Sequence, residues 1–188
     1  MVTQDTLGSR LAARERTQDE VHRLLGRLIH AYARLDLNMG LQLKWLGPYR
    51  GVPIDHLLDK RVPLAHRFCA LRPLVLEVYA TDGVDASRSF SQWFDRADEA
   101  KALRNDYAHG RWLFDTADEC ADPHFDFVAL SWEMDPAKQD PPLRLSLTQF
   151  RRQVEEMELL SGEFFKLESK FRDRCLPPIA YQKHSERK

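Results

Sequence analysis

The stretch TQDEVHRLLGRLIHAYARLDLNMGLQLKWLGP, residues 17–48, decides the expected fold. Its apolar residues recur every three or four positions, which is the spacing of one face of an α-helix. They are Val21, Leu24, Leu25, Leu28, Tyr32, Leu35, Met39, Leu43 and Leu46. Thr17 and Glu20 match a capping box, so we expect the helix to begin there, after a polar N-terminal arm at 1–16. Gly47, followed by a proline, should end it.

Three further helices are predicted from the same apolar spacing. One begins after Pro63, because proline is accepted in a first turn, and it ends before Gly83. The next begins at 85–89 and ends at His109, with a glycine directly after it. The last begins near Thr148 and ends before a pair of prolines at 177–178.

Residues 111–147 have a different character, because apolar and polar side chains alternate there over short runs separated by acidic or proline-rich connections. The expected strands are 111–114, 125–133 and 143–147. We therefore expect a mainly α protein with a small antiparallel β appendage between the third and last long helices. The helical domain should cover 17–175, followed by a disordered tail at 176–188.

The composition narrows the classes of function. The 188 residues carry a formal net charge of −1, which argues against a broad basic surface that coats nucleic acid. Cys69, Cys120 and Cys175 are odd in number and far apart, so we expect reduced thiols in a cytoplasmic protein. No apolar run is long enough for a membrane span, and the histidines lack metal-ligand spacing. We expect neither a metal nor another cofactor.

The residues that indicate chemistry are Arg104-Asn105-Asp106-Tyr107-Ala108-His109-Gly110, at the end of the third helix. A histidine can transfer a proton near neutral pH, and an arginine can hold a phosphate through two hydrogen bonds. Cleavage of RNA by its own 2′-hydroxyl needs a base, an acid and a cation beside the phosphate. His109 is the candidate base or acid, and Arg104 is the candidate phosphate clamp.

The position of Arg104 on the helix is itself unusual, because it falls inside the apolar arc. Arginine is rarely buried without a partner, so either Arg104 is tied to a carboxylate or this face meets a cleft or a second subunit. Asp36, at the edge of the apolar stripe of the first helix, is a candidate support for Arg104. Asn105 lies one turn before His109 and could orient the imidazole or a substrate hydroxyl.

With these residues the chain resembles the HEPN superfamily (higher eukaryotes and prokaryotes nucleotide-binding). The signature of that family is an arginine, a polar residue directly after it, and a histidine four to six residues past the arginine. Arg104, Asn105 and His109 match it. The resemblance implies an up-and-down helical bundle, a homodimer with both motifs at its interface, and a metal-independent endoribonuclease. Such proteins act as toxins, in phage defence or in RNA processing, which implies an antitoxin or defence-system partner.

Two other interpretations remain open. Arg104 could pair with Asp106, Glu99 or the acidic loop at 115–122 while His109 caps a helix carbonyl, which would make the motif structural. The chain could also be a catalytically silent module that binds a nucleotide or a protein, as some HEPN members do. Trp112, three residues beyond His109, is a candidate platform on which an RNA base could stack.

Overall fold

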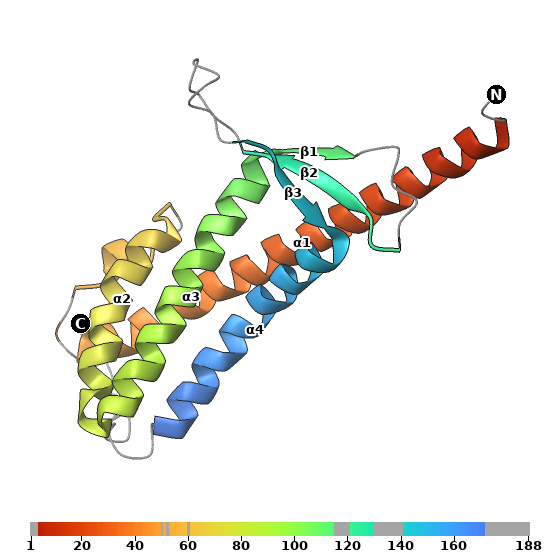
Figure 1. Cartoon of the computed structure of the whole chain (residues 1–188). Coiled ribbons are helices and arrows are strands. Elements are labelled where there is room, and N and C mark those ends of the chain that lie inside the picture. Colours follow the sequence, from red (N-terminus) through yellow and green to blue (C-terminus); the bar gives the residue numbers. More distant parts are fainter. Residues whose placement is uncertain are drawn as a thin grey trace. The chain divides into compact units, whose positions relative to one another are not determined.

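The computed structural model describes residues 4–49, 51, 53–59, 61–114, 121–129 and 141–171. The described residues form four long helices and a three-stranded antiparallel sheet that follows the third helix (Figure 1). The elements are α1 (Gln4–Tyr49), η1 (Asp55–Leu57), α2 (Leu64–Tyr79), η2 (Ala80–Asp82), α3 (Val84–His109), β1 (Arg111–Phe114), β2 (His124–Val128), β3 (Leu143–Ser146) and α4 (Leu147–Phe171). The mainly α prediction with a small β appendage is confirmed.

The predicted start of the first helix is wrong. Helix α1 begins at Gln4, so the described part of the expected N-terminal arm is helical. Thr17 is not an N-cap: its hydroxyl donates a 3.1 Å hydrogen bond to the carbonyl of Ala13, one turn earlier. The first turns lack a buried apolar face, since Leu7 and Leu11 are exposed. Residues 10–16, all of them alanine, leucine, arginine or glutamate, have good helical propensity, and the turns before the predicted start form without the core pattern that marked the rest of the helix.

The capping box of this chain lies instead at the start of α4. The Gln149 backbone N–H donates to the Ser146 hydroxyl at 3.2 Å, and the Ser146 N–H donates to the Gln149 side-chain oxygen at 2.8 Å. This reciprocal pair satisfies two backbone donors of the first turn. The Asp122 carboxylate accepts the N–H of Thr148 at 2.8 Å, and hydrogen bonding from Ser146 lowers the Asp122 pKa. These bonds join the sheet to the last helix.

The predicted starts of α2 and α3 agree closely with the structure, whereas α1 continues through Gly47 and Pro48 to Tyr49, past its predicted end. Helix α2 begins directly after Pro63, and Gly83 adopts φ +97°, a conformation that favours glycine, immediately before α3. The strand predicted at 125–133 is shorter in the structure, because β2 ends at Val128. Residues 130–133 lie outside the described part of the chain. So do the predicted end of the last helix and the tail at 176–188.

The strands pair in the order β1-β2-β3, both times antiparallel. Trp112 lies opposite Phe127, and Phe114 lies opposite Phe125, so large rings occupy one face of the sheet. Phe125 and Phe127 are buried, whereas Leu113 on the other face is exposed. The ring side therefore forms the contact between the sheet and the helices, and β1 lies at one edge.

The chain divides into two compact units, each made of segments distant in sequence. Unit 1 comprises Met1–Asn38 and Asp95–Ser161, and unit 2 comprises Met39–Phe94 and Gly162–Lys188. In unit 2, Phe90 contacts Tyr79 and Phe164 with ring centroids 4.5 and 5.7 Å apart. These contacts join α2, α3 and α4 segments through large apolar surfaces.

In unit 1, polar contacts connect the helices around an apolar core. Arg27 of α1 forms a two-point ion pair with Glu158 of α4, at 2.7 and 2.9 Å. The Tyr107 hydroxyl of α3 donates to Gln153 of α4 at 2.9 Å. The buried apolar residues are Val21, Leu24, Leu28, Ala31, Leu35, Ala97, Tyr107, Phe125, Phe127, Leu145, Phe150, Val154, Met157 and Leu160. The end of α3 is therefore held by α4 and by the sheet.

Candidate functional site at the end of α3

Arg104 lies half-buried on α3, with its guanidinium over the ring of Tyr32 from α1. The guanidinium carbon is 4.7 Å from the ring centroid, a distance at which the cation is attracted to the π face. The first helix thus supplies an aromatic support for the arginine. Sequence periodicity assigned Tyr32 to the core stripe and gave no indication of this contact.

The hydrogen bonds of Arg104 leave much of its capacity unused. Its Nη1 donates to the Asn105 side-chain oxygen at 3.0 Å, while its Nε is buried without a hydrogen-bond partner among the described residues. No carboxylate pairs with Arg104 in this part of the chain, so the expected partners Asp106 and Glu99 do not hold it. Among the described residues, the buried Nε of Arg104 therefore keeps a donor that a bound anion would satisfy.

Asp36 is half-buried one turn after Tyr32 on α1. Within the described residues, the contacts of Arg104 are Tyr32 and Asn105, and an ion pair with Asp36 is not among them. The support of Arg104 by Asp36 stays a prediction.

His109 is exposed in the last turn of α3, and Asn105 is exposed one turn earlier. Asn105 contacts Arg104, and no hydrogen bond between Asn105 and His109 is present in the described structure. Five residues at about 100° each place Arg104 and His109 about 140° apart around the helix. The structure therefore brings Arg104 and Asn105 together, but within one chain His109 faces away from Arg104.

Two residues beside His109 fix the end of α3. A Cβ placed on Gly110 would overlap the Phe127 ring and lie 2.8 Å from the Val128 carbonyl oxygen. Glycine is required here by close packing on β2 rather than by a left-handed backbone, because its φ is not positive. Burial raises the pKa of Tyr107 to about 12, so its phenol stays protonated at neutral pH and donates to Gln153. Tyr107 therefore anchors the end of α3 to α4.

Trp112 is half-buried, and it packs in the core of unit 1 rather than standing free as a stacking platform. Its ring centroid lies between 5.0 and 5.5 Å from those of four other rings: Tyr107, Phe125, Phe127 and Phe150. These ring contacts hold Trp112 in place, and with it the position of β1.

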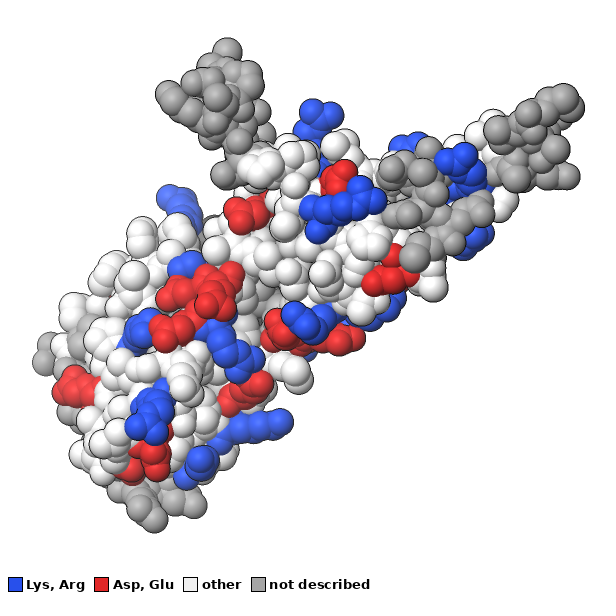
Figure 2. All heavy atoms as spheres, in the orientation of Figure 1, with Lys and Arg blue, Asp and Glu red and all other residues white. Residues whose placement is uncertain are grey.

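The charged side chains do not gather into one basic surface on the face displayed in Figure 2, where basic and acidic groups alternate. The described residues contain no group of three histidine, cysteine or acidic side chains placed to hold a metal ion. Cys69 is free and exposed, and the other two cysteines lie outside the described part of the chain. None of the described helices combines the length and the apolarity needed to cross a membrane.

The chain matches no protein-family model, no curated protein and no solved structure. The function of this chain is therefore inferred from its own residues and their geometry.

Proposed function

We propose that this protein is a metal-independent endoribonuclease of HEPN type that acts as a homodimer, with Arg104 and His109 in its active groove. RNA is the substrate, and the protein works in the cytoplasm as a toxin or phage-defence component held in check by a partner protein. The observation that carries the proposal is the state of Arg104. Among the described residues, its guanidinium lies against the Tyr32 ring without a paired carboxylate, which leaves donors that a bound phosphate would accept from.

The chemistry requires three functions at one phosphate. A base removes the proton of the 2′-hydroxyl, whose oxygen forms a bond to phosphorus. The bond from phosphorus to the 5′-oxygen breaks, and an acid protonates that leaving oxygen. The products are a 2′,3′-cyclic phosphate and a 5′-hydroxyl. Arg104 stabilises the charge that develops on the phosphoryl oxygens, and Asn105 holds the guanidinium through its 3.0 Å bond.

A homodimer supplies what one chain lacks. His109 faces about 140° away from Arg104 on the same helix, and one imidazole serves poorly as base and acid in the same step. Two copies that place their α3 ends together provide two imidazoles and two guanidinium groups around one substrate. The exposed positions of His109 and Asn105 leave them available for such an interface.

The test is incubation of purified protein with total RNA and tRNA in EDTA, beside Arg104→Ala and His109→Ala. We expect cleavage by the wild type, cyclic-phosphate ends, and a loss of at least about 100-fold in either variant, as for other general acid–base and charge-stabilising groups. Matched controls are Arg96→Ala, an exposed arginine on the same helix, and His66→Ala, an exposed histidine on α2. Equal cleavage by all five proteins would mean that a contaminating nuclease is responsible.

A catalytically silent binding module is the second candidate, and the divergence of Arg104 and His109 within one chain favours it. Light scattering separates the two candidates at low cost. A monomer at working concentration, combined with no cleavage, would support the binding module, because the two side chains would then never meet. A dimer that cleaves RNA would exclude it.

A further inference from the structure

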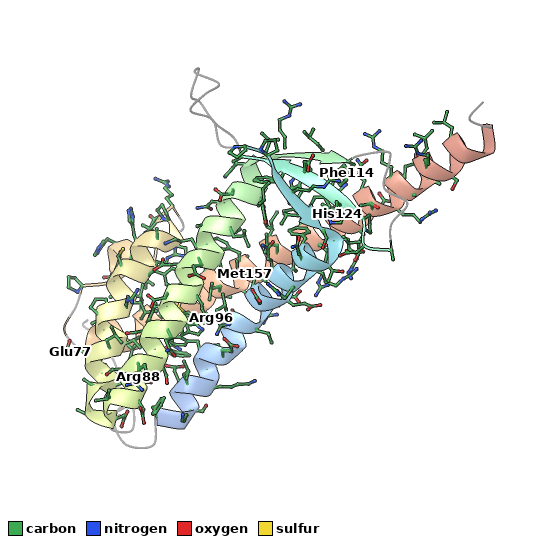
Figure 3. The ribbon with its side chains drawn as sticks, viewed as in Figure 1. Glu77, Arg88, Arg96, Phe114, His124 and Met157 are labelled. Carbon is green, nitrogen blue, oxygen red and sulfur yellow. The ribbon has the colours of Figure 1, made fainter. Side chains whose placement is uncertain are left out.

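A groove of about 430 Å³ lies between the N-terminal half of α1 and the edge strand β1, both in unit 1. Its lining is Arg14, Gln18, His22, Trp112, Leu113 and Phe114. The volume falls within the range of small-molecule sites in proteins. Figure 3 shows Phe114 where β1 runs beside α1. Its ring meets that of His22 edge-on at a centroid distance of 6.2 Å.

The side chains from α1 form a polar wall with regular spacing. Arg14, Gln18 and His22 are each four residues apart, so they share one face of the helix. Arg14 and His22 are exposed and Gln18 is half-buried, which leaves their polar groups facing solvent at the groove. A guanidinium binds phosphate through a fork of donors, and amide and imidazole groups can recognise base edges.

The opposite wall is aromatic and fixed. The four ring contacts of Trp112 hold β1 in place, so the groove does not need to be ordered when a ligand enters. Phe114 is half-buried and Leu113 is exposed, so the wall presents apolar surface opposite the polar residues. One cationic side chain facing an aromatic and apolar wall is a combination typical of single-stranded RNA sites.

We propose that this groove binds one nucleotide of single-stranded RNA, with Arg14 on its phosphate and its base against Phe114 and His22. The proposal rests on the proposed function, because it makes the groove a positioning subsite for the strand cut near His109. The chain connects the two sites directly: β1 begins two residues after His109. RNA with a base in the groove would be fixed relative to the end of α3.

An extended peptide added to the edge of β1 is the competing occupant. The edge is only four residues long, and side chains of α1 stand beside it, which restricts the space for a continuous strand ladder. The donors in the groove also suit phosphate and base edges. The observations therefore favour RNA, and the peptide becomes an outcome of the test.

The test measures binding of a fluorescein-labelled 2′-O-methyl oligouridine, which cannot be cleaved because its 2′-oxygen is blocked. Arg14→Ala should weaken binding about tenfold and lower the slope of log affinity against log salt by about 0.7, the value for one phosphate contact on a single strand. The matched control is Arg16→Ala, which removes the same charge from an exposed position two residues away and outside the groove. It should change binding less than about twofold. Both positions are exposed, so circular dichroism should show both variants folded.

The outcomes distinguish the subsite from the nuclease. Arg14-dependent binding without cleavage would support the subsite and overturn the nuclease proposal. Cleavage that requires Arg104 and His109 but is unaffected by Arg14→Ala at subsaturating RNA would overturn the subsite alone. No binding by the wild type, or equal effects of Arg14→Ala and Arg16→Ala, would also overturn it.

Discussion

Arg67 in unit 2 and Arg104 in unit 1 show how differently the two units use an arginine. Arg67 is buried, and its Nε and Nη2 donate to the carbonyls of Leu57 and Asp59 at 2.9 and 3.0 Å. Arg104 has one hydrogen bond to its own neighbour Asn105, a ring beneath it, and a buried Nε without a partner in the described residues. The donors of Arg67 bind backbone carbonyls of its own fold, whereas Arg104 has a buried donor with no partner among the described residues.

A structural arginine differs from a functional one in what its donors contact. Both lie on helices that pack in the interior, and helical periodicity alone does not say which donors of either arginine find a partner. The difference lies in the backbone nearby: the carbonyls of Leu57 and Asp59, in and just after η1, accept from Arg67, whereas Arg104 donates to the Asn105 side chain. If the interpretation is right, replacing Arg67 should damage stability and replacing Arg104 should damage function.

The largest effect is expected for Arg67→Met. This variant leaves the carbonyls of Leu57 and Asp59 without their charged donor, so the free energy of unfolding should fall by about 3 kcal/mol. Urea unfolding monitored by circular dichroism measures it. The control is Arg88→Met, an exposed arginine of α3 in the same unit, labelled in Figure 3. If Arg67→Met lowers the free energy of unfolding by less than about 1 kcal/mol, Arg67 is no more structural than Arg104 is expected to be.

Gly110→Ala should have the next largest effect, in unit 1. The added methyl would overlap the Phe127 ring, and overpacking of this kind costs about 2 kcal/mol. Because His109 precedes this glycine, cleavage of RNA should fall as well. The matched control is Gly26→Ala on α1, where a Cβ meets nothing within 4 Å. Equal stability of the two variants would show that the contact with β2 does not fix the helix end.

Arg104→Met should lower the free energy of unfolding by less than about 1 kcal/mol. It removes one cation–π contact and one exposed hydrogen bond, and it also removes the unpaired buried Nε. The same denaturation experiment, beside Arg67→Met, gives the comparison directly. A loss as large as that of Arg67→Met would identify Arg104 as structural and weaken the nuclease proposal.

The smallest effect concerns acid stability in unit 1. Hydrogen bonding from Arg23, with a further contribution from Arg151, lowers the Glu20 pKa from 4.5 to about 2. The ion pairs therefore stabilise the fold above about pH 4.5, and this contribution is lost as the pH falls toward 2. Glu20→Gln should lower the free energy of unfolding at neutral pH by at most about 1 kcal/mol. Melting temperatures at pH 7 and pH 3 should converge for this variant relative to the wild type.

The control for that experiment is Glu156→Gln, which replaces an exposed carboxylate of α4 lying 3.6 Å from Arg152. It should leave the difference between the two melting temperatures close to that of the wild type. If both variants behave alike, the contacts of Glu20 add nothing to the acid dependence beyond net charge.

The helix boundaries show which parts of the fold local patterns could predict. The apolar stripes and the residues Pro63 and Gly83 located α2 and α3, because these signals act within a few residues. The start of α1 was misplaced since its first turns bury little apolar surface and so carry no stripe. Ser146 and Gln149 match the same capping pattern as Thr17 and Glu20, and only the observed bonds distinguish a real cap from a chance match.

The candidate site also has one part that local sequence predicts and another part that depends on distant segments. Sequence alone determined that Arg104, Asn105 and His109 lie at a helix end and that the protein is mainly α. The packing of distant segments was needed to show that Arg104 rests on the Tyr32 ring, with no carboxylate partner in the described part of the chain, and that Arg14 and His22 face β1 across a groove. The reason is physical: helical periodicity is a property of neighbouring residues, whereas a side chain's partner depends on which distant segment folds against it.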